Sequence, residues 1–376
     1  MLKINVGKLY TGKRIEENKT LEIENGKIVG IRDFKGQSDL IAIPGFIDMH
    51  NHGGYGIDYL SSKDYDFEDL QVKQAGEGIT SMLATIGVAS YEDMEASIVR
   101  LGSYIENKNT KGARILGINV EGPFLSPKYL GVMDEDSLKA VDVDLMKDWI
   151  KKSGDNIKLV TIAPELDGAE ALIKYLTSHG IISSAGHSDA TSKDMNKAIA
   201  NGLSQVTHMF NAMRPLHHRE LGILGEALTN DFLYAEMAGC DELSIHPKIW
   251  KMAYKLKTAE KMILTTDALT LKGLPNGRYS YMGMELDFVD GFAYTNYHGA
   301  DRLPGKPMTF IGNIKNVMKN TGARLEDIVT MSSVNPAKRL KIDHEKGYLE
   351  LGYDADINII DQNHKLISTY IEGEKI

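Results

Sequence analysis

The chain has 376 residues and a mass of 41.6 kDa, and its 42% hydrophobic content allows a large folded core. A net charge of -9 and a pI near 5.7 argue against nucleic acid or an anionic membrane surface as a partner. The single Cys240 excludes an internal disulfide framework. Residues 1–6 are too polar for a signal peptide, and no run approaches the roughly 20 apolar residues of a membrane span. We therefore expect a soluble, cytoplasmic protein.

Both ends of the chain have the pattern of β-structure. Short apolar runs alternate with turn signals over residues 1–42, and Asn25-Gly26 predicts a β-hairpin. Residues 337–376 have the same pattern. Because two-stranded fragments are only marginally stable alone, we expect the two ends to pair into one small, β-sandwich-like domain.

Residues 43–336 alternate apolar, strand-like runs with helical stretches, which is typical of a parallel sheet covered by helices. Eight β/α units predict a (β/α)₈ TIM barrel that forms the catalytic domain. The expected helices include 91–107, 136–152, 168–179, 191–201 and 246–257. The expected strands are 46–52, 79–87, 113–122, 157–165, 181–188, 205–210, 233–239 and 262–268.

Polar side chains gather where the expected strands end. His50 and His52 are two residues apart, so their imidazoles point to the same face of a strand, although such a pair alone is more often an accident of composition. Barrels of this kind place their chemistry at the carboxyl ends of the strands. Five of the eight expected strands carry a metal-ligand type of side chain there: His50, His52, Glu121, His187, His208 and Asp267. The set predicts a divalent metal site, with zinc as the expected ion and iron, cobalt or manganese as alternatives.

This ligand set suits hydrolysis. A divalent cation lowers the pKa of water to about 7 and polarises a carbonyl. A nearby carboxylate is then needed as general base and afterwards as general acid. Asp267 is the natural candidate, and the alternative interpretation is that it only caps the following helix.

Several motifs occur together along nearly the whole chain. They are Pro44–Gly56, Val120–Leu125, Ala185–Ser188, Thr207–Met213, His217–Glu220, Thr266–Ala268, Val334–Lys338 and Gly352–Asp356. This combination resembles the N-acetylglucosamine-6-phosphate deacetylases of the amidohydrolase superfamily. The resemblance implies a (β/α)₈ barrel with a small β domain built from both termini. It also implies deacetylation of N-acetylglucosamine 6-phosphate to glucosamine 6-phosphate and acetate in amino-sugar catabolism.

The resemblance implies roles for the candidate metal ligands. Glu121, His187 and His208 match the residues that hold one ion, and His50 and His52 allow a second, so one or two ions per chain are expected. Asp267, which we also count with the metal ligands, matches the catalytic acid/base that moves a proton from water to the sugar nitrogen.

The resemblance also implies contacts to an N-acyl amino-sugar phosphate. Asn211 and Ala212 match substrate-contacting positions. Arg219 matches a phosphate-binding arginine that reaches the neighbouring active site of a homodimer, and its guanidinium offers a planar fork of donors. We count His218 with the substrate-binding candidates, and an ordinary surface histidine is the alternative interpretation.

Three departures from the family pattern fall on the substrate side. Gly131-Val132-Met133 replaces Gly-Ala-His, Ser244 replaces a substrate-binding histidine, and 303–306, ending in Lys306, replaces Leu-Ala-Gly-Ser. One alternative is therefore another substrate, such as N-acetylgalactosamine 6-phosphate or a different N-acyl small molecule, with Lys306, Arg302 or His298 as anion contacts. The other alternative is a metal-binding barrel without turnover.

Overall fold

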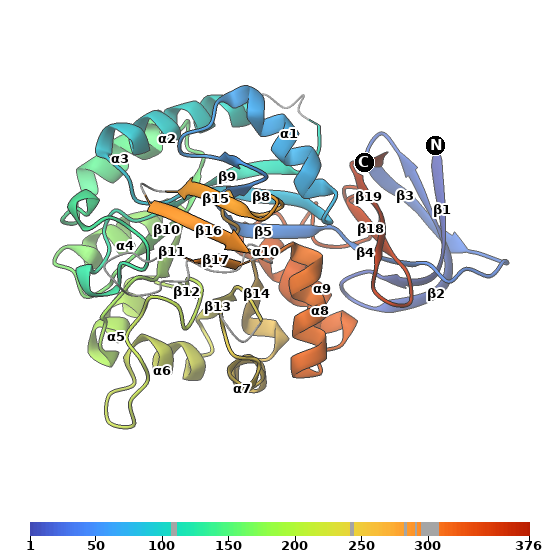
Figure 1. Cartoon of the computed structure of the whole chain (residues 1–376). Helices are drawn as coiled ribbons and strands as arrows, with labels where there is room; N and C mark the ends of the chain where they lie inside the picture. Colours follow the sequence, from blue (N-terminus) through green and yellow to red (C-terminus); the bar gives the residue numbers. More distant parts are fainter. Residues whose placement is uncertain (107–110, 241–243, 282–283, 290–291, 295–307) are drawn as a thin grey trace.

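A sheet of eight parallel strands forms the centre of the computed structural model, which describes residues 1–106, 111–240, 244–281, 284–289, 292–294 and 308–376 (Figure 1). Every neighbouring pair in this sheet is parallel. In order, the strands are β5 (Phe46–Asn51), β8 (Ile79–Ile86), β9 (Arg114–Glu121), β10 (Ile157–Ile162), β11 (Ile182–Ala185), β12 (Gln205–Val206), β13 (Tyr234–Met237) and β14 (Met262–Leu264).

The first and last strands of this sheet approach each other through the residues that follow them. An isolated parallel bridge joins Asn51 to Ala268. The backbone N–H of His52 donates to the carbonyl of Ala268, and that of Asp267 donates to the carbonyl of His50, both at 2.9 Å. The sheet is therefore a near-closed barrel, and the expected (β/α)₈ fold is confirmed.

Side chains fill the barrel. One buried apolar cluster draws its members from β5, β8, β10, β11 and β14, which can meet only through the interior. It comprises Met49, Leu83, Leu159, Ile182 and Ile263. The barrel is thus a packed core, and its mouth is the place left for chemistry.

Several strands end earlier than expected. β12 stops at Val206 and β14 at Leu264, because the backbone leaves the extended conformation just beyond them. His187, His208 and Asp267 have backbone φ angles of 46°, 26° and 49°. Side-chain-bearing residues adopt such angles rarely and at some cost in energy, and they cluster at functional sites.

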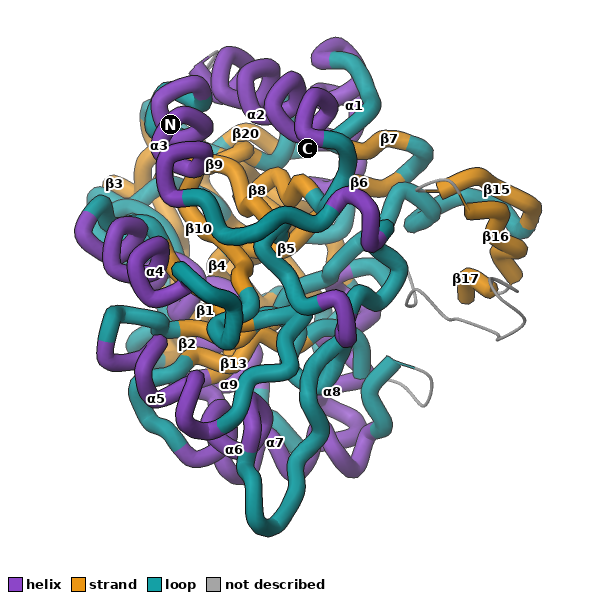
Figure 2. Tube along the Cα trace, turned by 90° about the vertical axis from the view of Figure 1, so that its left-hand side faces the viewer, coloured by secondary structure: helices purple, strands orange, loops and turns teal. Residues whose placement is uncertain are grey.

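Helices cover the outside of the barrel (Figures 1 and 2). The helix expected over 136–152 begins at Val143, because the Asp142 side chain caps it by accepting from two backbone N–H groups. The helices are α1 (Asp64–Ala75), α2 (Tyr91–Glu106), α3 (Val143–Lys152), α4 (Ala169–Ser178), α5 (Ser192–Ala200), α6 (Gly222–Thr229), α7 (Pro247–Lys257), α8 (Phe310–Thr321), α9 (Leu325–Val329) and α10 (Asn335–Arg339). Short 3₁₀-helices cover Pro127–Tyr129, Glu135–Ser137 and Ala259–Lys261, and a short π-helix covers Thr330–Val334.

The two chain ends form a separate seven-stranded sheet beside the barrel (Figure 1). Antiparallel pairing of β4 with β18 joins the N-terminal and C-terminal parts. The order is β20 (Glu374–Lys375), β19 (Leu366–Ile371), β18 (Ile357–Ile360), β4 (Ile41–Pro44), β1 (Leu2–Tyr10), β2 (Ile15–Glu24) and β3 (Lys27–Asp33). Asn25-Gly26 connects β2 to β3, as expected. β4 has residues on both sides of the expected boundary after residue 42. The division into 1–42 with 337–376 and 43–336 stays a prediction.

Two small sheets lie in the loops after the strands. β6 (Gly53–Gly54) pairs with β7 (Ile57–Asp58) directly after the first strand of the barrel. β15 (Gly277–Tyr281), β16 (Met284–Val289) and β17 (Phe292–Tyr294) form an antiparallel sheet after the last. Among the described residues, no helix is long and apolar enough to cross a membrane.

Candidate metal centre

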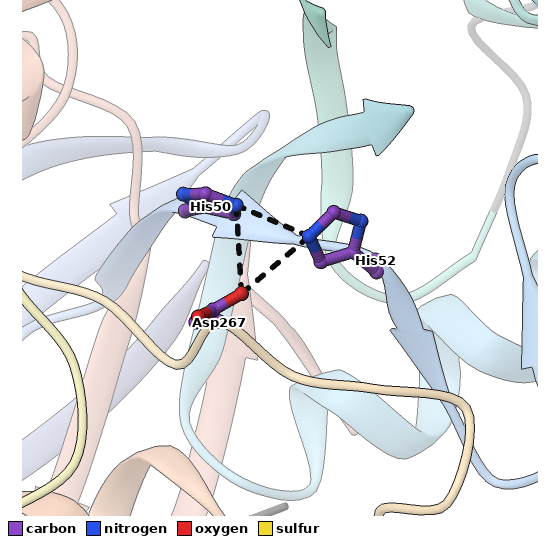
Figure 3. A group of neighbouring side chains, drawn as sticks. All are labelled: His50, His52 and Asp267. Atoms are coloured by element: carbon purple, nitrogen blue, oxygen red, sulfur yellow. Dashed lines mark hydrogen bonds and ion pairs between the residues drawn. The ribbon is translucent and has the colours of Figure 1, made fainter. Parts of the chain in front are cut away.

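Three donor side chains meet where the barrel closes. His50 lies in the last two residues of β5, His52 follows the strand, and Asp267 follows β14 (Figure 3). The two imidazole Nε2 atoms are 3.1 Å apart. The Asp267 Oδ1 atom lies 3.5 Å from Nε2 of His50 and 3.4 Å from Nε2 of His52. All three side chains thus point one donor atom at a common space.

A second group of donors lies at the ends of β9, β11 and β12. Glu121 Oε1 is 3.2 Å from Nε2 of His187 and 2.9 Å from Nε2 of His208. The two imidazole nitrogens are 3.1 Å apart. All three residues are buried, so water competes little for their donor atoms.

Glu121 lies between the two groups. Its Oε1 atom faces His187 and His208, whereas its Oε2 atom is 3.6 Å from Nε2 of His50 and 3.3 Å from Nε2 of His52. One carboxylate therefore serves both groups, which is the arrangement that a ligand shared by two cations requires.

The imidazoles and carboxylates of the site shift one another's pKa values. Burial alone would lower the pKa of His50, but the carboxylates of Glu236, Glu121 and Asp267 raise it well above its usual value. Burial also opposes protonation of His52, yet Asp267 and Glu121 raise its pKa to about 9. Conversely, burial would raise the pKa values of Glu121 and Asp267, and the neighbouring imidazoles, with His50 the largest contributor, hold both below the usual range. The pocket thus stabilises positive charge, which protons or metal cations can supply.

A buried carboxylate that we did not predict orients one ligand. Glu236, on β13, accepts from Nδ1 of His50 at 2.7 Å and from the backbone N–H of His208 at 3.1 Å. Its other oxygen accepts from Gln205 at 3.2 Å. A carboxylate on the far ring nitrogen fixes Nε2 toward the donor group, as is usual for metal-ligating histidines. A single acidic residue within an apolar strand was the signal available in the sequence.

Two further contacts hold the ligand-bearing loops. The buried Asp48 side chain accepts from the hydroxyls of Thr265 and Thr266 at 2.7 and 2.6 Å, which fastens β5 to the segment that carries Asp267. The carbonyl oxygen of Tyr129 accepts from Nδ1 of His187 at 2.8 Å. Both contacts fix backbone or ring orientation at the mouth.

The substrate-side candidates occupy two different places. Asn211 and Ala212 follow His208 within four residues, and the Ala212 carbonyl accepts from the backbone N–H of Ser188, the neighbour of His187. His218 and Arg219 are exposed on the loop between β12 and α6, which projects from the barrel in Figure 1. The structure therefore brings the first pair, but not the second, beside the metal-ligand candidates of this chain.

The structure describes some of the positions at which the sequence departs from the family pattern. Met133 is only 9% exposed and packs with Val88 and Leu125, while Val132 packs on the apolar face of the β15–β17 sheet. An added Cβ on Gly131 would lie 3.4 Å from the ring of His187, so this loop borders the second donor group. Ser244 is half-buried. His298, Arg302 and Lys306 lie outside the described residues.

The donor set fits divalent cations. Within each group, all donor atoms lie within 4.8 Å of one another. Ligands about 2.1 Å from a tetrahedral ion are about 3.4 Å apart, close to the separations found here. A parallel barrel with such donors at its mouth defines the class of metal-binding barrel hydrolases. Residues 41–376 match the model of the amidohydrolase family, and the chain belongs to that family.

Curated relatives within the family are N-acetylglucosamine-6-phosphate deacetylases. The Bacillus subtilis enzyme is 34% identical over 97% of this chain and 91% of its own length. The Lysinibacillus sphaericus enzyme is 36% identical over 92% of this chain and 88% of its own. Among solved structures, the Thermotoga maritima deacetylase has a TM-score of 0.90 at 29% identity, covering 100% of this chain and 99% of that one.

A substrate complex is known for another of these proteins. An aspartate-to-alanine variant of the Mycobacterium smegmatis deacetylase was solved with N-acetylglucosamine 6-phosphate. Its TM-score is 0.91 at 27% identity, covering 100% of this chain and 98% of that one.

Proposed function

We propose that this chain is a metal-dependent amide hydrolase that converts N-acetylglucosamine 6-phosphate to glucosamine 6-phosphate and acetate in amino-sugar catabolism. The observation that carries the proposal is the pair of donor groups joined by Glu121 at the barrel mouth. The deacetylase relatives, which match nearly the whole chain, support the choice of substrate.

The two donor groups suit one ion each, with zinc as the expected metal and iron, cobalt or manganese as alternatives. His50, His52 and Asp267 would hold the first ion, and His187 and His208 the second, with Glu121 shared between them. When bound, such ions polarise a carbonyl and lower the pKa of water. The bond between Nδ1 of His50 and Glu236 leaves Nε2 of His50 for this purpose.

Asp267 is our candidate for the proton transfer. Its side chain is 26% exposed, so it reaches both the buried donors and the open mouth. Protonated imidazoles lower the pKa of its carboxyl in the metal-free chain, and bound cations would take their place, so Asp267 is ionised and can accept a proton from water. It would then return that proton to the sugar nitrogen as acetate leaves.

The substrate contacts follow from position. Asn211 and Ala212 lie beside the metal centre and would contact the sugar. His218 and Arg219 stand on an exposed loop, which suits phosphate binding in the partner active site of a homodimer. A soluble, cytoplasmic location agrees with a small phosphorylated substrate.

The test is acetate release by the zinc-loaded protein from N-acetylglucosamine 6-phosphate. Parallel reactions contain the galacto epimer, the unphosphorylated sugar and several N-acyl amino acids. Preferred turnover of N-acetylglucosamine 6-phosphate is expected, because the metal half of the site is complete and the relatives over nearly the whole chain are deacetylases of this sugar phosphate. Preference for another amide would indicate that the altered Val132–Met133 loop recognises a different substrate. If none of the tested amides were hydrolysed, the result would favour a metal-binding barrel without catalysis.

A further inference from the structure

A fully buried cation lies beside the metal-ligand loops. Lys272 follows β14, and its side chain is 0% exposed. The ammonium group contacts Oε1 of Glu77 at 3.0 Å and Oε1 of Gln74 at 2.6 Å, both at the end of α1. A buried ammonium is costly unless it is paired and hydrogen-bonded, so these two partners explain how the charge is tolerated.

Glu77 ties several segments to this cation. Its Oε1 atom also accepts from the Tyr55 hydroxyl at 2.5 Å, and its Oε2 atom accepts from the backbone N–H of Phe310 at 3.0 Å. The carbonyl of Lys272 accepts from the backbone N–H of Tyr55 at 2.5 Å. The loops after β5 and β14 and the start of α8 are therefore fastened together around one ion pair.

Gln74 connects the ion pair to the ligand-bearing strand. Its Nε2 atom donates to Oδ1 of Asn51 at 3.2 Å and to the carbonyl of Gly53 at 3.1 Å. These two residues lie on either side of His52, and Asn51 also separates His52 from His50. The amide of Gln74 thus holds the backbone that carries both imidazoles.

The same network continues to the segment that carries Asp267. Nδ2 of Asn51 donates to Oδ2 of Asp48 at 2.9 Å, and that oxygen also accepts from the Thr266 hydroxyl at 2.6 Å. Lys272 is thereby connected through side chains to the neighbours of all three residues in the first donor group. The contacts found at the second group are different, because Tyr129 orients His187 and Glu236 binds the backbone of His208.

The charge of Lys272 determines how Gln74 is oriented. With Oε1 facing the ammonium, Nε2 faces two acceptor oxygens, and every contact pairs a donor with an acceptor. A flipped amide would place its NH₂ against the ammonium and its oxygen against the oxygens of Asn51 and Gly53. Removing the ammonium removes the donor that selects the observed orientation.

We propose that Lys272, acting through Gln74 and Asn51, is a positioning residue for the His50, His52 and Asp267 half of the metal centre. The inference rests on the proposed function, in which each half holds one ion. It predicts selective loss of affinity in that half. Groups that hydrogen-bond a metal ligand directly typically change metal affinity about 10-fold to 100-fold, so the lower end of that range is expected for Lys272 and Gln74, which bond the neighbours of the ligands.

Two substitutions separate positioning from charge balance. Lys272→Met removes the ammonium but leaves the buried Glu77 without its cation. Gln74→Leu leaves the Lys272–Glu77 ion pair in place and removes the hydrogen bonds that Gln74 makes with Lys272, Asn51 and Gly53. Lys73→Met is the matched control, because Lys73 also lies over the Tyr55 ring, at 5.5 Å against 5.7 Å for Lys272, but is exposed and paired with Asp69.

The experiment titrates the metal-free full-length variants with cobalt(II) and follows both stoichiometry and the visible absorption spectrum. His52→Ala supplies the reference spectrum of the second half alone. Thermal unfolding of each metal-free variant checks that it is folded.

The expected result is two ions in wild type and in Lys73→Met. In Gln74→Leu and Lys272→Met, the ion of the second half should bind with wild-type affinity and give the spectrum recorded for His52→Ala. The ion of the first half should bind at least 10-fold more weakly than in wild type. Wild-type affinity for both ions in folded Gln74→Leu, or equal weakening of both, would overturn the inference. Binding of fewer than two ions by wild type would instead contradict the two-ion site of the proposed function. If Lys272→Met does not fold, Gln74→Leu alone decides.

Discussion

Replacement of Glu236 by glutamine tests how strongly the metal centre depends on its buried support. Glu236 is 0% exposed, and its bond to Nδ1 of His50 is 2.7 Å long. Glutamine keeps the shape but exchanges a charge-assisted bond for a neutral one and points an NH₂ group at the amide of Gln205 or at His50. Hydrogen bonds to charged groups contribute about 1.5–3 kcal/mol and neutral ones about 1 kcal/mol, so the loss is about 0.5–2 kcal/mol. Since 1.4 kcal/mol is about tenfold, zinc affinity should fall about 2-fold to 30-fold.

The assay is a competition titration of metal-free protein with zinc and a chelator. Glu226→Gln is the control, because Glu226 is a buried glutamate on α6 that binds Ser192 and Asn196 instead of a metal ligand. Unchanged affinity in folded Glu236→Gln, or an equal fall in the control, would refute the proposed role of Glu236.

Three other predictions concern stability. Lys346 contacts Asp354 at 2.7 Å and Asp356 at 2.8 Å in a buried cluster. Lys346→Met should therefore lower the free energy of unfolding by about 3–5 kcal/mol, because it leaves buried carboxylates without their cation. Lys365→Met is the control, because Lys365 is exposed. Urea unfolding measures this, and a change below about 1 kcal/mol would contradict it. Burial lowers the pKa of Lys257 to about 8, against 10.5 for the ordinary side chain. Between these pH values the unfolded chain binds more protons, so the free energy of unfolding should gain a rising contribution from pH 8 to 10.5. Lys257→Met should lose that rise and the exposed Lys255→Met should keep it; equal slopes in both would disprove the assignment. Finally, chelation should lower the melting temperature, because ions that bind only the folded state stabilise it, and an unchanged value would argue against a resident metal.

The sequence predicts the barrel and its ligands because both follow simple periodic rules. Alternating strands and helices require a parallel sheet, and a parallel barrel brings the carboxyl ends of its strands to one mouth. His50, Glu121 and Asp267 could therefore be expected to meet although they are far apart in the chain. That Glu121 faces both donor groups could not be predicted, because this depends on its side-chain rotamer.

The supporting residues show where sequence reasoning ends. Glu236 and Lys272 are single charged residues in largely apolar stretches, and neither has a spacing rule that reveals its partner. Their partners, His50 and Gln74, are supplied by distant elements. The helix expected from residue 136 also began later, because local capping by Asp142 outweighed the periodic pattern.

The most direct test of the central claim compares single-turnover acetate release by wild type and Asp267→Asn on N-acetylglucosamine 6-phosphate, at equal measured metal content. General acid–base catalysis contributes about 10²-fold to 10⁴-fold, so the variant should be slower by that factor when both proteins carry the same amount of metal. Equal rates with equal metal content would show that Asp267 does not transfer the proton, and would contradict the mechanism built on this site.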